Sequence, residues 1–157
     1  MFTEEVECPR PFTYYSGTEE VMHVVVVDSH EAMREGLRQM LNGDENIRVI
    51  GEAKDCKEAL NQVQSLCPEI IVVDVATAVR SLDGIKIINQ LKQLSQHAGV
   101  IVLSDENDAL IPAIENGASG FLTRDITRNE LIAAVRITYT WRSVLFGEGN
   151  HFVLVRL

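Results

Sequence analysis

Apolar, β-branched runs that alternate with stretches of helical spacing constrain the fold of this chain most strongly. Residues 24–27 and 70–73 are unbroken apolar runs, as expected for strands that are buried on both faces of a sheet. Residues 31–41 and 56–66 carry apolar side chains three and four positions apart, which is typical of amphipathic helices. This alternation predicts an α/β sandwich, in which helices cover both faces of a parallel sheet.

The same patterns continue along the chain and divide it into three parts. The predicted strands are 21–27, 47–53, 69–73, 99–103 and 120–122, and the predicted helices are 31–41, 56–66, 85–94, 109–115 and 127–141. Asn42-Gly43 should end the first helix, and Thr127 with Glu130 forms a capping-box pattern at the start of the last one. We therefore expect an N-terminal extension (1–20), an α/β domain (21–143) and a C-terminal tail (144–157) with a short strand at 152–155.

Charge and hydropathy exclude several classes of function. The formal net charge of -9 repels a phosphate backbone, so direct DNA binding is not expected from this chain. The apolar runs are far shorter than the roughly 20 residues of a membrane helix. The acidic N-terminus lacks the apolar segment of a signal peptide, so we expect a cytoplasmic protein.

Polar residues stand where four of the predicted strands end, namely Asp28, Asp74, Ser104 and Arg124. If the strand order is 2-1-3-4-5, these four ends converge on one crevice. Carboxylates bind hard cations such as Mg²⁺, whereas a hydroxyl and a guanidinium bind phosphoryl oxygens. The sequence therefore predicts a site for a phosphoryl group and a divalent cation.

Other classes of site lack their motifs. The turn after the first strand, residues 28–31, contains no glycine, which excludes a P-loop or a dinucleotide fingerprint. No Gly-x-Ser-x-Gly elbow occurs in the sequence and Ser104 has no evident histidine partner, so we do not expect an enzyme. A small-molecule-binding domain stays open as an alternative, although the acidic lining favours a cation over an anionic cofactor.

Several segments resemble the receiver domains of two-component signalling, in particular those of regulators that carry a helix-turn-helix output domain. The segments are VVVVDSHEAMREGLRQML, VIGEAKDCKEALNQV, PEIIVVD, DGIKII, VIVLS and AIENGASGFLTRDITRNELIAAVR, and together they span about three quarters of the chain. The resemblance implies a doubly wound, flavodoxin-like (βα)5 fold with the sheet order 2-1-3-4-5. The tail, 144–157, is too short for an output domain, so we expect none in this sequence.

The resemblance also implies roles for individual residues. Asp74 would be the phosphoacceptor, and a histidine kinase would supply the phosphoryl group. Mg²⁺ would be bound by Asp28, Asp74 and the backbone carbonyl of Ala76. Ser104 corresponds to the switch hydroxyl of the family, and Phe121 to the aromatic residue that moves with it.

The presumed site departs from the family pattern at several positions. Ser29 stands where the family has a second acidic residue, which would make Mg²⁺ binding weak or absent. Arg124 replaces the usual lysine, Asp105 replaces a small residue, and the loop after Asp74 is longer and lacks proline.

Two interpretations follow from these departures. One is an atypical receiver that is phosphorylated on Asp74 in a phosphorelay. The other is a degenerate pseudo-receiver that acts through protein contacts alone, held by an Arg124–Asp74 pair. In both, the expected surface for a protein partner or a homodimer is the fourth helix, fifth strand and fifth helix, roughly residues 107–141.

Overall fold

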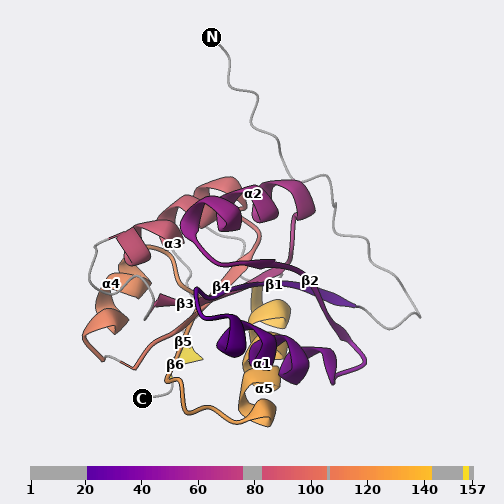
Figure 1. Cartoon of the computed structure of the whole chain (residues 1–157). Helices are drawn as coiled ribbons and strands as arrows, with labels where there is room; N and C mark the ends of the chain where they lie inside the picture. Colours follow the sequence, from indigo (N-terminus) through magenta and orange to yellow (C-terminus); the bar gives the residue numbers. More distant parts are fainter. Residues whose placement is uncertain (1–20, 76–82, 106, 143–153, 156–157) are drawn as a thin grey trace.

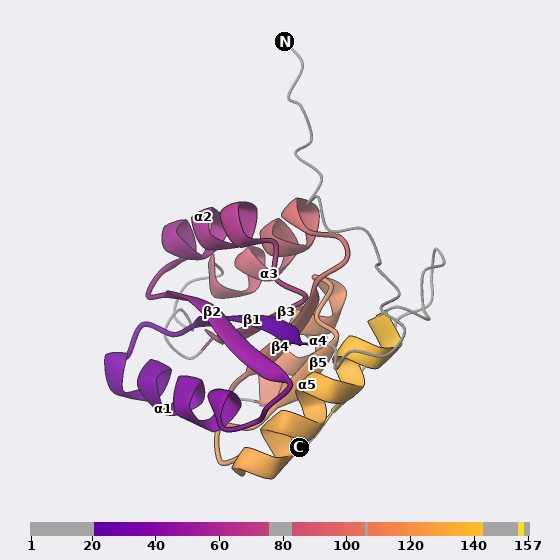
Figure 2. The same cartoon turned by 90° about the vertical axis from the view of Figure 1, so that its right-hand side faces the viewer.

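A parallel β-sheet lies between two layers of helices (Figure 1, Figure 2). The computed structural model describes residues 21–75, 83–105, 107–142 and 154–155. The predicted extension at 1–20, the loop after Asp74 and the expected metal ligand Ala76 lie outside these residues. Within the described part, the predicted α/β sandwich is confirmed.

All strand pairings in the sheet are parallel, and the strand order is β2-β1-β3-β4-β5-β6. The strands are β1 (Met22–Val27), β2 (Ile47–Ala53), β3 (Ile70–Asp74), β4 (Gly99–Leu103), β5 (Gly120–Leu122) and β6 (Leu154–Val155). The predicted order 2-1-3-4-5 of the first five strands is confirmed. Of the strand predicted at 152–155, residues 154–155 form β6 and pair with β5 at the edge of the sheet, and residues 152–153 lie outside the described residues.

The helices form one layer on each face of the sheet (Figure 2). One layer contains α1 (Glu31–Asn42) and α5 (Arg128–Arg142), and the other contains α2 (Cys56–Leu66), α3 (Asp83–Leu94) and α4 (Leu110–Glu115). Along β1, Val24 and Val26 pack in the core beneath the first layer, and Val25 and Val27 pack beneath the second. Because successive side chains of a strand point to opposite faces, a strand covered on both faces has a continuous apolar sequence.

The helix ends follow the signals in the sequence. Helix α1 ends with Gly43 as its C-cap residue, as predicted. The Glu130 N–H donates a hydrogen bond to Thr127 Oγ1 over 3.2 Å, which is the predicted capping interaction at the start of α5. None of the helices in the described segments is long and apolar enough to cross a membrane.

Two helices differ from their predicted bounds by more than one residue or in type. The predicted helix 109–115 is a 3₁₀ turn, η2 (Asn107–Ala109), followed by α4. Pro112 lies in the first turn of α4, where its missing N–H removes no hydrogen bond of the helix. Helix α3 begins at Asp83, two residues before the apolar periodicity that predicted it from residue 85.

Candidate functional site

The predicted polar residues gather at the carboxyl ends of four adjacent strands. Asp28 follows β1, Asp74 ends β3, Ser104 follows β4, and Arg124 lies just beyond β5. Parallel strands present their carboxyl ends at the same edge of a sheet, so the strand order brings these residues to one end of the molecule. Asp28, Asp74 and Ser104 are all buried, with exposed fractions of 0%, 2% and 0%.

The guanidinium of Arg124 holds the carboxylate of Asp74. Its Nε and Nη2 atoms both donate to Asp74 Oδ2, over 2.9 and 2.5 Å. Its Nη1 atom points to Asp105 Oδ2 at 3.5 Å. Burial lowers the pKa of Arg124, but hydrogen bonding and charge attraction from Asp74 and Asp105 outweigh burial and raise the pKa above its ordinary value. Arg124 is therefore a fixed cation between two carboxylates.

Asp28 is a buried acid with one unpartnered oxygen. Its Oδ1 accepts a hydrogen bond from the His30 N–H over 2.8 Å, whereas its buried Oδ2 has no hydrogen-bond partner. Burial raises the pKa of Asp28 from 3.8 to about 6, and the neighbouring Asp74 carboxylate adds to the rise; the His30 N–H and Arg124 act in the opposite direction. The ionised form of Asp28 thus has no hydrogen-bond donor at Oδ2.

This donor set fits a hard divalent cation held by two carboxylates. A cation at Asp28 and Asp74 would bring positive charge to the unpartnered Asp28 Oδ2. No cluster of three or more His, Cys, Asp or Glu suited to a metal occurs among the described residues. Ser29, at the position where a third carboxylate was expected by resemblance, is exposed and neutral. The remaining ligands of such a cation would have to be backbone oxygens, water or a bound phosphoryl group.

Ser104 and Phe121 occupy different surroundings. Ser104 is fully buried, and its N–H donates to the Leu122 carbonyl over 3.0 Å, which anchors the end of β4 to β5. Phe121 is fully buried within the core cluster on the α2–α3–α4 side of the sheet. In this structure Phe121 is a core side chain of β5. Its movement on phosphorylation, which the resemblance implies, stays a prediction.

Two residues of the site had no assigned role in the sequence. Arg34 of α1 donates from Nη1 to the backbone carbonyl of Asp28 over 2.9 Å, so it braces the turn that carries this acid. Asp105 is a departure from the family pattern beside Ser104, and the structure pairs it with Arg124. The one signal in the sequence was that Asp105 directly follows the strand-end residue Ser104, at the end of the sheet where Arg124 was also expected.

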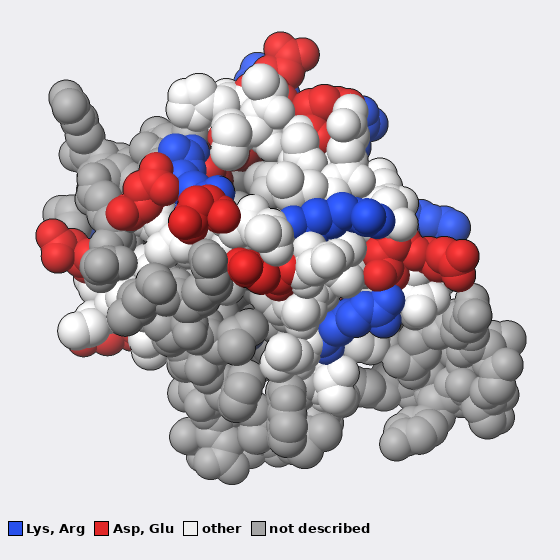
Figure 3. Space-filling view, turned by 90° about the horizontal axis from the view of Figure 1, so that it is seen from below, with Lys and Arg blue, Asp and Glu red and all other residues white. Residues whose placement is uncertain are grey.

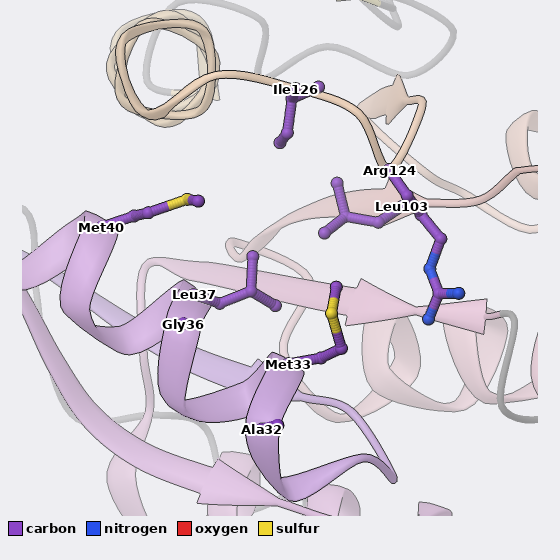
Figure 4. Close-up of a pocket in the computed structure, with 8 residues that line it drawn as sticks. All are labelled: Ala32, Met33, Gly36, Leu37, Met40, Leu103, Arg124 and Ile126. Carbon is purple, nitrogen blue, oxygen red and sulfur yellow. The ribbon is translucent and has the colours of Figure 1, made fainter.

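An apolar pocket adjoins the acidic site. It has a volume of about 110 Å³ and is lined by Ala32, Met33, Gly36, Leu37, Met40, Leu103, Arg124 and Ile126. Figure 4 shows Met33 and Leu37 of α1 facing Leu103, with the side chain of Arg124 at one end. The pocket and the acidic site therefore share Arg124. The lining of this pocket is apolar apart from Arg124, so a small molecule bound there would be held mainly by its apolar surface.

Comparison with known families agrees with this architecture. Residues 24–136 match the family described as the response regulator receiver domain. The match covers more than half of the chain and lies within the α/β domain predicted at 21–143. The chain belongs to the response regulator receiver domain family.

Curated relatives share this region. The chain is 32% identical over 139 residues to the DNA-binding transcriptional activator DevR/DosR of Mycobacterium tuberculosis. The aligned region covers 87% of this chain and 63% of the relative. It is 28% identical over 136 residues to the response regulator protein VraR of Staphylococcus saprophyticus, which covers 85% of this chain and 62% of the relative. The chain thus spans less than two thirds of the length of these relatives.

Solved structures show the same fold. The signal receiver domain of the response regulator NarL from Mycobacterium tuberculosis superposes with a TM-score of 0.69 at 29% identity, covering 77% of this chain and 98% of that domain. The response regulator domain of Thermotoga maritima CheB gives a TM-score of 0.68 at 28% identity, covering 77% of this chain and 98% of that domain. The protein is therefore a receiver domain of the two-component response-regulator class, and the predicted flavodoxin-like fold is confirmed.

Proposed function

We propose that this receiver domain accepts a phosphoryl group on Asp74 from a histidine kinase and signals through protein contacts. The observation that carries the proposal is the buried Asp74 carboxylate at the end of the central strand β3, bound by Arg124 and adjacent to a second buried acid, Asp28. Receiver domains act with histidine kinases in two-component signalling, and those of transcriptional regulators are in general not enzymes.

The chemistry assigned to Asp74 is a displacement at phosphorus. A carboxylate oxygen of Asp74 forms the new P–O bond as the P–N bond to the kinase histidine breaks, and the imidazole nitrogen keeps the electron pair and takes up a proton. Arg124, already at hydrogen-bonding distance from Asp74, would donate to the phosphoryl oxygens. The Ser104 hydroxyl would bind another of these oxygens.

Mg²⁺ supports phosphoryl transfer in receiver domains generally, because it neutralises charge on the phosphoryl oxygens. In this chain, Asp28 and Asp74 are the residues that would hold it, and Asp28 Oδ2 is the oxygen without another partner. With two carboxylates and an exposed Ser29, we expect weak binding until a phosphoryl group adds its own oxygens. The expected ligand Ala76 lies outside the described residues.

A phosphorylation-independent pseudo-receiver is the second candidate. Two observations favour it: Arg124 donates twice to the proposed acceptor oxygen, and the position expected for the third carboxylate holds exposed Ser29. In this case the Arg124–Asp74 pair would be a permanent structural ion pair, and partners would recognise a single conformation of the domain.

Acetyl phosphate distinguishes the two candidates. The chain is incubated with acetyl phosphate and Mg²⁺, and the intact mass is measured together with that of Asp74→Asn. We expect the mass of one phosphoryl group on the unmodified chain and none on the variant. A chain that stays unmodified at high Mg²⁺ would favour the pseudo-receiver and contradict phosphorylation of Asp74.

Output by protein contact is proposed for the face that α4, β5 and α5 form. Ile111 of α4 is 66% exposed, which makes it the most exposed large apolar side chain among the described residues. Substitution of Ile111 by Ser should weaken self-association or partner binding, as measured by analytical ultracentrifugation of the phosphorylated chain. The same substitution should leave the monomer stable, because the Ile111 side chain is largely in solvent.

DNA binding is named for one relative, a DNA-binding transcriptional activator that is longer than this chain. Similarity to a DNA-binding protein does not support our expectation that this chain lacks direct DNA binding. The expectation stays a prediction. Over the described surface seen in Figure 3, acidic and basic side chains stand beside one another. A mixed surface of this kind supports a protein partner over a phosphate backbone.

A further inference from the structure

Asp105 is exposed at the edge of the proposed site and takes no part in the proposed phosphoryl transfer. Its side chain is 63% exposed, and Oδ2 lies 3.5 Å from Nη1 of Arg124. The other two nitrogens of the same guanidinium bind Asp74 Oδ2. Arg124 is thus shared between an inner carboxylate, which is buried, and an outer carboxylate, which reaches solvent.

The two contacts differ in strength. Nε and Nη2 approach Asp74 to 2.9 and 2.5 Å, which are ordinary lengths for charge-assisted hydrogen bonds. The Nη1–Asp105 separation of 3.5 Å is at the limit of a hydrogen bond. In this state, therefore, Arg124 is held mainly by Asp74, and Asp105 is a second position that it can reach by a small outward movement.

A divalent cation and Arg124 compete for the same carboxylate. A cation bound between Asp28 and Asp74 would place positive charge close to the guanidinium, and like charges repel strongly in a buried site. Arg124 must then give up part of its contact with Asp74. Its side chain is only 21% exposed, and Asp105 offers a negative charge on the solvent side.

We propose that Asp105 is a positioning residue that draws Arg124 away from Asp74 and so sets the affinity of the Asp28–Asp74 pair for a divalent cation. This inference rests on the proposed function of that pair, and it extends it to a residue outside the acidic pair. Without Asp105, Arg124 stays on Asp74 and the cation binds more weakly. Without Arg124, Asp105 has nothing to draw away and its effect on cation binding is largely lost.

A double-mutant cycle tests this coupling. The dissociation constant for Mg²⁺ is measured by isothermal titration calorimetry at fixed ionic strength for the full chain, Asp105→Asn, Arg124→Ala and the double variant. We expect Asp105→Asn to weaken Mg²⁺ binding about three- to tenfold in the presence of Arg124, and less than about twofold in the Arg124→Ala background. Arg124→Ala alone should tighten binding.

A matched control separates this role from a general effect of charge. Asp108→Asn removes the same charge from an exposed residue of η2 for which no contact with Arg124 is found. We expect it to change Mg²⁺ affinity by less than about twofold in either background. Equal weakening by Asp105→Asn in both backgrounds, or equal weakening by Asp108→Asn, would overturn the proposed coupling.

The same titrations distinguish failure of this inference from failure of the proposed function. Mg²⁺ binding in every variant, with no change on Asp105→Asn, would overturn the role of Asp105 and leave the Asp28–Asp74 site in place. Absence of Mg²⁺ binding in all four proteins, including Arg124→Ala, would overturn the cation site itself and this inference with it.

Discussion

Two arginine–aspartate pairs in this domain use the same chemistry in different surroundings. Arg124 binds Asp74 at the carboxyl ends of the strands, and Arg136 of α5 binds Asp44 in the turn between α1 and β2. The shortest N–O distances are 2.5 and 2.6 Å. The side chains of Arg124 and Asp74 are 21% and 0% exposed, whereas those of Arg136 and Asp44 are 45% and 15% exposed.

The surroundings decide what each pair does. The Arg136 guanidinium lowers the pKa of Asp44, and the Asn46 N–H adds to this effect, so Asp44 is a well-compensated surface anion. Asp74 instead lies beside Asp28, whose pKa burial raises to about 6. The Arg136–Asp44 pair, the outer pair, connects α5 to a turn. The Arg124–Asp74 pair, the inner pair, belongs to a cluster with an excess of buried negative charge. We infer that the inner cluster is built for a cation or phosphoryl ligand, at a cost in stability.

The largest expected difference between the two pairs is the loss of unfolding free energy when each arginine is replaced by alanine. Arg124→Ala should lower the free energy of unfolding by about 2–4 kcal/mol, because it leaves a buried carboxylate uncompensated. Arg136→Ala should cost about 1 kcal/mol or less, as is usual for exposed pairs. Urea unfolding at neutral pH with a chelator present measures both. Similar losses for the two variants would show that the inner pair is not effectively buried.

A conservative substitution controls for the loss of packing at Arg124. Arg124→Lys keeps the positive charge, so it should recover more than half of the stability that Arg124→Ala loses. If Arg124→Lys is as unstable as Arg124→Ala, shape and not charge accounts for the effect.

The stability contributions of Asp28, in the inner cluster, and of Asp44, in the outer pair, should depend on pH with opposite signs. Because the pKa of Asp28 is about 6 in the folded chain and 3.8 in its ordinary state, the folded chain binds the proton more tightly. Its contribution to stability is therefore complete below about pH 4 and is lost as the pH rises through 6. Asp28→Asn should then stabilise the chain by about 1–3 kcal/mol at pH 7 and by little at pH 4.

Asp44→Asn is the opposite case. The pKa of Asp44 is lowered in the folded chain, so its contribution to stability is present above its ordinary pKa of 3.8 and is lost as the pH falls through the lower, folded value. Asp44→Asn should destabilise the chain slightly at pH 7. Chemical unfolding of both variants between about pH 2 and pH 7, without metal, checks the two slopes. Parallel slopes would contradict the difference between the two acids.

The smallest expected effect is the response to salt. At about 1 M NaCl the Debye length falls to roughly 3 Å, so exposed pairs are screened far more than buried ones. The stability difference between the unmodified chain and Arg136→Ala should fall by about half, a change below about 0.5 kcal/mol. The difference for Arg124→Ala should stay nearly constant over the same range of salt. An equal response would place both pairs in solvent.

The sequence predicted the fold well because the signals for it are local. The runs at 24–27 and 70–73 could be assigned to central strands from their composition alone, and Gly43 and Thr127 marked helix ends through short-range hydrogen bonds. The strand order brought Asp28, Asp74, Ser104 and Arg124 to one end of the sheet, as the sequence predicted. The assigned roles of these residues in phosphorylation stay predictions.

Contacts between distant residues could not be predicted in the same way. Arg136 and Asp44 are 92 residues apart, and neither belongs to a motif. The link from Arg124 to Asp105 depends on the conformation of a long side chain, which sequence spacing does not determine. The short strand β6 falls within the strand predicted at 152–155, but its pairing with β5 joins distant residues and was not predicted.

The central claim is that the Asp28–Asp74 cluster binds a cation and a phosphoryl group together. Beryllofluoride with Mg²⁺ imitates the phosphoryl group without a kinase, and its binding can be followed by ¹⁵N–¹H nuclear magnetic resonance of the chain. We expect saturable shifts at the amides of Asp28, Asp74, Ser104 and Arg124 that are larger with Mg²⁺ and beryllofluoride together than with Mg²⁺ alone, and no shift that depends on beryllofluoride in Asp74→Asn. Unchanged amide positions at these four residues, in a folded chain at saturating Mg²⁺, would contradict the account.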